Sequence, residues 1–253
     1  MSTISAPLTD SRVMLRRNLK HIIRNPVTIF NAALMPVVLM LLLVYVFGNA
    51  FNVGEHYVEY ATPGLIVLAI SYGLAGTAVS VNSDMTKGII NRFKVMNVSR
   101  GAVLTGHVVA TMLSTSVAIA VIIGIAFALG FRSPATPLDW LGAIGIIAAT
   151  AFAAAWLTVA LGMAAKTPES AALTVVPLLL LPFVSSAIVP ADKMGQGVRQ
   201  FAQYQPFTPI IESLRGLLAG TPSGGYAAAA LAWCAGIALV GYLWALTTFK
   251  RRT

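Results

Sequence analysis

The chain has 253 residues, of which 57% are hydrophobic and only 10% carry a charge. Soluble domains usually carry about 25% charged residues, so too few polar side chains are present to cover a water-soluble globule of this size. The composition therefore predicts a polytopic α-helical integral membrane protein. The excess of 17 basic over 8 acidic side chains indicates loops that face anionic lipid head groups, and we expect no nucleic-acid partner.

The first predicted element is a cytoplasmic amphipathic helix within residues 1–26 that does not cross the membrane. Apolar and basic side chains of residues 9–25 fall on different faces of a helical wheel. Such a helix lies flat, with its apolar face in the acyl boundary and its basic face toward the phosphates. The alternative is the basic start of a signal peptide, but the following apolar run is too long and lacks a cleavage site of small residues.

Six apolar runs follow, and each is near or above the roughly 20 residues that cross a bilayer. They are 27–47, 60–81, 103–129, 138–164, 171–189 and 226–249. The sequence therefore predicts a six-helix transmembrane domain over 27–253. Residues 190–225 are proline-interrupted and only partly polar, and we expect a re-entrant hairpin on the outer side. It should pack against the bundle, because non-helical backbone at membrane depth must be shielded from lipid.

The distribution of basic residues predicts the orientation. With both termini in the cytoplasm, the cytoplasmic side carries 13 Lys and Arg residues and the outer side carries 4. Cytoplasmic loops are enriched in Lys and Arg, so this orientation is strongly favoured over its reverse. Residues 82–102 then form the only long cytoplasmic loop.

The sequence offers no motif for chemistry of its own. It has no GxxxxGK[ST] phosphate loop, no HExxH and no GxSxG, so we expect no catalytic residue, no metal and no cofactor. No carboxylate lies well inside a predicted span, which argues against a proton-coupled carrier. His107 has two interpretations, a titrating relay or, as we favour, an interface residue with local hydrogen bonds. If the protein is a pump, its energy must come from a partner, and the loop 82–102 is the place to receive it.

Two segments resemble a known family. Residues 84–94 and 98–104 resemble the cytoplasmic loop of type-2 ABC exporter permeases, and the D-x-x-x-G-x-x-x-R-F pattern is especially like the daunorubicin-resistance branch. Residues 205–220 resemble the segment before the last helix of that branch, and Val189-Pro190 also fits. One departure is Asn97-Val98, where many relatives carry proline beside an aliphatic residue. The resemblance extends over essentially the whole chain.

The resemblance implies the permease subunit of an ATP-driven exporter in the bacterial inner membrane. Its partners would be two copies of a separate ABC ATP-binding subunit, which binds the ATP, and a second permease copy in a homodimer or a heterodimer. The loop 82–102 would act as a coupling helix in the cleft of the ATPase, unless it is only a solvated loop in contact with lipid. The expected coupling residues are Asp84, Gly88, Arg92, Phe93, Met96 and Arg100.

The same resemblance places the second and fifth helices of both copies around a central pathway. In the fifth run, Pro177 and Pro182 each remove a helical hydrogen bond and permit a hinge. The candidate gate and lining residues are Leu178, Leu179, Leu181 and Phe183. We favour Leu178, with Leu179 or Leu181 beside it, although ordinary lipid-facing leucines are the alternative. Candidate residues of the outer segment are Pro206, Pro209 and Arg215.

The expected cargo is a hydrophobic or amphipathic small molecule such as a drug, an antibiotic or a lipid. A polysaccharide or a lipid-linked glycan is the alternative. The fifth run offers aliphatic residues and Phe183 but no aromatic or acidic ladder suited to sugars. A membrane enzyme that acts on lipid is a third interpretation, but it would need a polar catalytic cluster that the sequence lacks.

Overall fold

The computed structural model describes residues 26–48, 56–86 and 100–252. Its regular secondary structure is helical throughout these ranges, with no strand among them. The predicted interfacial helix before Pro26 and residues 87–99 of the predicted coupling loop lie outside the described residues. The all-helical class that the sequence predicts is confirmed for the described part of the chain.

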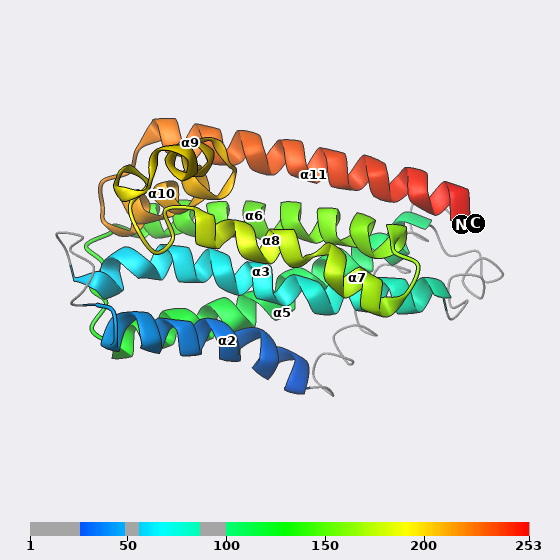
Figure 1. The fold of residues 1–253 in the computed structure, drawn as a ribbon, viewed down its shortest axis with the longest axis horizontal. Coiled ribbons are helices and arrows are strands. Elements are labelled where there is room, and N and C mark those ends of the chain that lie inside the picture. The colour runs from blue at the N-terminus through cyan, green and yellow to red at the C-terminus, as the bar shows by residue number, and fades with distance from the viewer. Residues whose placement is uncertain (1–25, 49–55, 87–99, 253) are drawn as a thin grey trace.

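Four helices of the described part are long and apolar enough to cross a membrane. They are α3 (Tyr57–Thr86), α5 (Arg100–Ala128), α6 (Pro137–Ala164) and α11 (Gly224–Arg252). Together with α2 (Pro26–Tyr45) they run side by side along the long axis of the molecule (Figure 1). Each begins or ends within a few residues of the bounds that hydropathy predicts, except that α3 and α5 extend into the predicted loop 82–102.

The predicted fifth span is not one continuous helix. It consists of α7 (Pro168–Thr174), α8 (Val176–Leu180) and the 3₁₀-helix η1 (Leu181–Val184). Pro177 lies at the start of α8 and Pro182 at the start of η1. The N–H groups of the first turn of a helix have no acceptor within that helix, so proline is tolerated there. The helix is therefore interrupted near both prolines, and a hinge movement at these interruptions stays a prediction.

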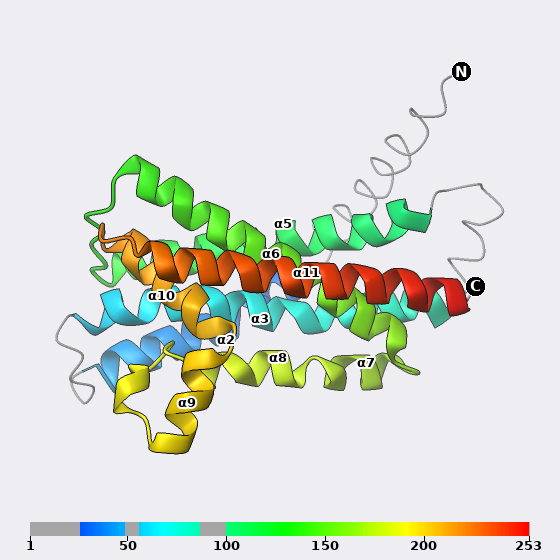
Figure 2. The same ribbon diagram turned by 90° about the horizontal axis from the view of Figure 1, so that it is seen from above.

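Successive helices alternate in direction, which gives the bundle two distinct ends. The α10 end holds the starts of α3, α6 and α11 together with α9 (Gln196–Tyr204) and α10 (Phe207–Leu218). The opposite end, which we call the C-terminal end, holds the ends of α3, α6 and α11 (Figures 1 and 2). Short connections between antiparallel neighbours produce this arrangement.

Helix α3 occupies the centre of the molecule. Nearly every residue from Tyr57 to Ser71 is buried, and the helix packs against α2, α5, α6 and α7. Small residues allow the closest contacts, since a Cβ atom on Gly162 of α6 would lie 2.6 Å from the Ala78 carbonyl oxygen of α3. Close approach at small residues is the usual way in which membrane helices gain packing energy.

The short helices at the α10 end are fixed by turn chemistry and by apolar packing. Helix α10 ends at Leu218 and is followed by Gly220, which has a φ of 69°, and the Thr221 N–H donates to the Gly216 carbonyl at 2.8 Å. This is the Schellman pattern, in which glycine adopts the left-handed conformation without steric cost. One face of α10, with Ile210, Ile211 and Leu214, is buried in the main core. The segment expected to fold against the bundle does so.

Candidate functional site

The C-terminal end of α3 is joined to both neighbouring helices by polar side chains. The Asp84 carboxylate Oδ2 lies 3.2 Å from Nε2 of His107 in α5, and their side chains are 12% and 9% exposed. Asn82 donates its amide Nδ2 to the carbonyls of Gly162 and Ala165, at 3.0 and 2.8 Å. Gly162 is in the last turn of α6 and Ala165 is its C-cap residue, where carbonyls have no further helical N–H donors. Asn82 therefore caps α6 from a neighbouring helix.

The location of Asp84 corrects the predicted bounds of the loop. Helix α3 continues through Thr86 and α5 begins at Arg100, so Asp84 lies inside a helix and is directed toward His107. Asn82 and Asp84 favour this outcome because their side chains find partners on α6 and α5. The roles of Gly88, Arg92, Phe93 and Met96 remain predictions, because these residues and the side chain of Arg100 lie outside the described part.

A polar seam between α3 and α5 extends from this pair. The hydroxyls of Thr77 and Thr111 lie 2.8 Å apart, and the Thr111 hydroxyl also donates to the His107 carbonyl. His107 thus lies between α5 and α3, and its side-chain partner Asp84 is on another helix, whereas the sequence led us to expect local hydrogen bonds. The sequence does carry a signal for this seam, since His107, Thr111 and Thr115 recur every four residues along one face of an apolar helix.

The candidate gate leucines face different directions. Leu178 packs against the cluster that contains Leu74 and Ala78 of α3, whereas Leu180 is 54% exposed. Leu179 and Leu181 are half-buried. Helix α8 packs against α3, the other helix that the resemblance assigns to the pathway, and Leu178 adjoins the apolar cluster that the two segments share. Phe183 is half-buried against the main core.

The chain after η1 is held tightly against the start of α3. The Tyr60 hydroxyl donates to the Ser186 carbonyl at 2.9 Å, and the Tyr57 hydroxyl donates to the Ile188 carbonyl at 3.1 Å. A Cβ atom on Gly64 would lie 2.5 Å from the Ala187 carbonyl oxygen. Only glycine permits this approach, so the segment after η1 and α3 form one packed unit.

Arg215 of α10 fastens this unit from the other side. Its Nη2 donates to the carbonyls of Tyr60 and Ser186, at 3.2 and 2.8 Å. The guanidinium carbon lies 3.9 Å from the centroid of the Tyr60 ring, and Nη1 pairs with Glu212. A planar guanidinium can stack and donate in several directions at once, which an ammonium cannot. The other two residues singled out in this segment flank the start of α10, with Pro206 before it and Pro209 buried in its first turn.

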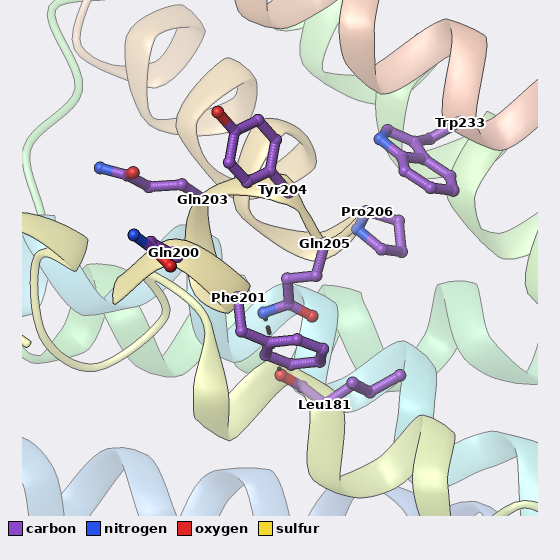
Figure 3. A pocket seen from close by; sticks show the side chains of 8 residues that line it. All are labelled: Leu181, Gln200, Phe201, Gln203, Tyr204, Gln205, Pro206 and Trp233. Atoms are coloured by element: carbon purple, nitrogen blue, oxygen red, sulfur yellow. Dashed lines mark hydrogen bonds between the residues drawn. The ribbon is translucent and has the colours of Figure 1, made fainter. Parts of the chain in front are cut away.

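A cavity of about 850 Å³ lies between η1, α9 and α11. It contains two residues from the sequence-based candidates, Leu181 and Pro206, but the sequence did not predict the cavity. Its wall combines three segments that are distant in the chain, and Figure 3 shows how they meet. The lining residues are Leu181, Gln200, Phe201, Gln203, Tyr204, Gln205, Pro206 and Trp233.

A bundle of apolar helices, with polar contacts concentrated at its two ends, defines a multi-pass membrane protein. The ABC-2 type transporter family matches residues 9–219, and the chain belongs to that family. It is 30% identical over 249 residues to the "Daunorubicin resistance ABC transporter permease protein DrrB1" of Streptomyces coeruleorubidus, covering 97% of this chain and 86% of that protein. It is 28% identical over 243 residues to the "Probable doxorubicin resistance ABC transporter permease protein DrrC" of Mycobacterium tuberculosis, covering 93% and 87%.

These comparisons confirm the family that the residues 84–104 and 205–220 resemble. The chain is a membrane permease of the ABC class, and membership of this family implies an ATP-binding subunit as its partner. Much of the polar network described above, including the Arg215 contacts, lies within the part of the chain that the family covers.

Proposed function

We propose that the chain is the membrane-spanning subunit of an ATP-driven exporter that moves hydrophobic or amphipathic small molecules, including drugs and antibiotics, out of the cell. The similarity that carries this proposal covers nearly the whole chain and leads to permeases named for daunorubicin and doxorubicin resistance. The aliphatic residues of α8 and η1 support an apolar cargo over the alternative, a polysaccharide or lipid-linked glycan. A lipid-acting enzyme is less favoured, because the described residues include no metal-binding group of His, Cys, Asp and Glu.

We infer six crossings of the membrane. The 20 residues of α2 span about 30 Å at 1.5 Å per residue, and the apolar segment Pro168–Val184 spans about 25 Å. Helices α9 and α10 then form the re-entrant segment on the outer side. The excess of basic residues assigns the C-terminal end of the bundle to the cytoplasm, and we therefore call it the inner end and the α10 end the outer end.

The ATPase transmits its movement, in this proposal, through the inner end of α3. Two copies of the ATPase bind a permease dimer, which is a homodimer or a heterodimer, and the chain itself binds neither ATP nor another cofactor. Asn82 and Asp84 join α3 to α6 and to α5 directly before the loop 87–99. A displacement of that loop would therefore move three helices together. The residues Arg92, Phe93 and Met96 supply charge and apolar surface for the contact with the ATPase.

The pathway opens, in the same proposal, at the break between α7 and α8. A segment of short helices bends more easily than a continuous helix, because fewer hydrogen bonds cross each junction. Leu178 packs against the apolar cluster that includes Leu74 and Ala78 of α3, and a dry leucine contact of this kind resists water and polar solutes until the helices separate.

The function is tested with proteoliposomes that contain the chain and its cognate ABC ATPase. We expect ATP-dependent transport of daunorubicin or doxorubicin, and no transport when the ATPase carries a substitution of its catalytic glutamate. A panel of amphipathic drugs, phospholipids and lipid-linked sugars then defines the cargo. Transport of sugars alone would favour the glycan alternative, and drug movement without ATP would contradict the proposal.

A further inference from the structure

We propose that the cavity between η1, α9 and α11 is a binding site for an aromatic amphiphile that carries a hydroxyl or ammonium donor. That this ligand is the exported substrate on its way out rests on the proposed function. That the cavity fits such a molecule rests on its walls alone. Its volume of about 850 Å³ is within the range of roughly 300–1,000 Å³ that is usual for small-molecule sites.

Three aromatic side chains form its apolar walls and leave much of their surface open. Phe201 is 51% exposed, Tyr204 80% and Trp233 43%. A second cavity, of about 460 Å³, adjoins the first through Tyr204 and Trp233. Aromatic rings with free faces stack on planar ligands in offset or edge-to-face arrangements. An aromatic ligand therefore fits these walls better than a sugar or a saturated acyl chain.

An interfacial aromatic belt is the ordinary explanation for such residues, and it does not account for Trp233. Tyr226 lies two residues after the start of α11 at Gly224, which is the level expected of a belt residue. Trp233 lies about two turns farther along the helix, or roughly 10 Å at 1.5 Å per residue. Its partly exposed indole therefore lies at the depth of the apolar outer leaflet, beside the cavity, where an amphiphile would enter or leave.

Gln205 supplies a hydrogen-bond acceptor of fixed orientation. Its amide Nε2 donates to the carbonyls of Leu181 and Val184, at 3.3 and 2.9 Å. The amide cannot flip without losing both bonds, so Oε1 keeps its position. This oxygen is buried and has no hydrogen-bond partner among the described residues. Buried polar groups normally find a partner, and an amide oxygen can only accept.

A ligand can complete this acceptor only if it brings a donor. Figure 3 shows the Gln205 amide directed toward Leu181, with the Phe201 ring near it in this view. Because about half of the Phe201 surface is exposed, its ring has room to turn aside and admit a donor group. None of the eight lining residues is charged. The cavity therefore selects ligands by their planar aromatic system and by their hydrogen-bond donor. That donor is either neutral or carries a single positive charge, because a cation can also bind over an aromatic face.

The test uses the permease–ATPase complex in nanodiscs and measures equilibrium binding of daunorubicin by dialysis, with empty nanodiscs subtracted. Trp233→Ala should weaken binding about three- to ten-fold, the range that corresponds to one lost aromatic contact. Trp244→Ala is the matched control, since Trp244 lies on the same helix three turns away and is 39% exposed. It should leave binding unchanged. Equal losses in the two variants, or no loss in either, would overturn the site.

The requirement for a donor is tested with ligands. Anthraquinone without hydroxyl or amino groups presents a similar planar system but no donor. We expect it to bind the wild-type complex at least about five-fold more weakly than daunorubicin, as one missing neutral hydrogen bond would predict. Equal binding of anthraquinone and daunorubicin would show that Gln205 does not select the ligand. If phospholipid displaces daunorubicin more effectively than other aromatic amphiphiles do, the cavity is a lipid site.

Transport in the same membranes separates this inference from the proposed function. If daunorubicin binding depends on Trp233 but no ATP-dependent transport is seen, the binding site is supported and the proposed export function is refuted. If Trp233→Ala leaves both transport and binding unchanged, the export function is supported and the binding site is refuted.

Discussion

Arg215 shows how one side chain can decide where a short helix lies. Its guanidinium bonds the carbonyls of Tyr60 and Ser186 and stacks on the Tyr60 ring. Its side chain is only 14% exposed. Charged hydrogen bonds in such surroundings contribute more than those at a surface, because water does not compete for them. Arg215 thus adds polar contacts to α3 and to the segment after η1 beyond the apolar packing of Ile210, Ile211 and Leu214.

We expect Arg215→Lys to destabilise the protein although it keeps the charge. Lysine cannot both stack on Tyr60 and donate to two carbonyls, so at least one charge-assisted hydrogen bond is lost, at a cost of about 1–3 kcal/mol. The measurement is the thermal midpoint of the purified permease in detergent, with transport as a second measurement. Arg199→Lys is the control, since Arg199 is exposed on α9. Equal midpoints for both variants would mean that the Arg215 contacts contribute nothing to stability.

Asp84 and His107 should prove energetically coupled. A double-mutant cycle with Asp84→Ala and His107→Ala isolates their interaction from other contacts of either residue. For a buried pair with a nitrogen–oxygen distance of 3.2 Å we expect an interaction term of about 0.5–3 kcal/mol. The cycle is measured by unfolding of the permease, and transport should fall in each single variant. Strict additivity of the two substitutions would refute the coupling.

At the scale of elements, α3 and the α7–α8 segment have different mechanical characters. Helix α3 is a continuous helix of 30 residues, and it contacts most of the other helices of the bundle. Residues 168–184, which we call the α7–α8 segment, are divided into two short α-helices and one 3₁₀-helix. A rigid central helix beside a jointed one allows relative movement without unfolding of either, because the bend is confined to junctions that already lack hydrogen bonds.

The gate is tested by comparing two leucines of α8 that face different ways. Leu178→Ala should weaken the contact with α3 and raise solute leak or basal ATP turnover in proteoliposomes. Leu180→Ala should change neither, because Leu180 is 54% exposed and contributes less to that contact. If alanine at 178, 179, 180 and 181 leaves transport, leak and basal ATPase activity unchanged, the gate is elsewhere.

At the scale of the whole molecule, the two ends differ in the kind of contact that holds them. At the C-terminal end of the bundle, α3 is joined to α5 and α6 by side chains that follow the end of the apolar run. The α10 end is closed by short helices and by Arg215. This polarity fits a protein in which a soluble partner acts at one end and the cargo leaves at the other.

The topology is tested by cysteine labelling in a Cys234→Ala background. Cys234 is buried, and the loss of its small thiol should be tolerated. Single cysteines at Ser99 and Thr253 should react with membrane-impermeant reagents only from the cytoplasm, and those at Asn52 and Ser223 only from outside. The physical basis is the distribution of 13 basic residues against 4. Labelling of position 99 from outside alone would overturn the orientation.

Local composition determined the class of the protein and most of its elements. In a bilayer, the backbone N–H and C=O groups of a long apolar run find their hydrogen-bond partners within a helix. The positions of α3, α5, α6 and α11 were therefore predictable to within a few residues. The prolines 177 and 182 likewise predicted a break, since a missing N–H acts on the nearest turn. The loop 84–104 and the segment 205–220 identified the family because their patterns are contiguous in the chain.

Only the tertiary structure decided which polar groups meet. Asn82 reaches carbonyls 80 and 83 residues away, and Arg215 bonds a carbonyl 155 residues away. The aromatic cavity likewise joins residues 181, 200–206 and 233. Helical periodicity gives the face on which a side chain lies but not the helix that packs against that face. That choice depends on close packing at positions such as Gly64 and Gly162, where the gain comes from backbone approach between distant segments and no single stretch of sequence reveals it.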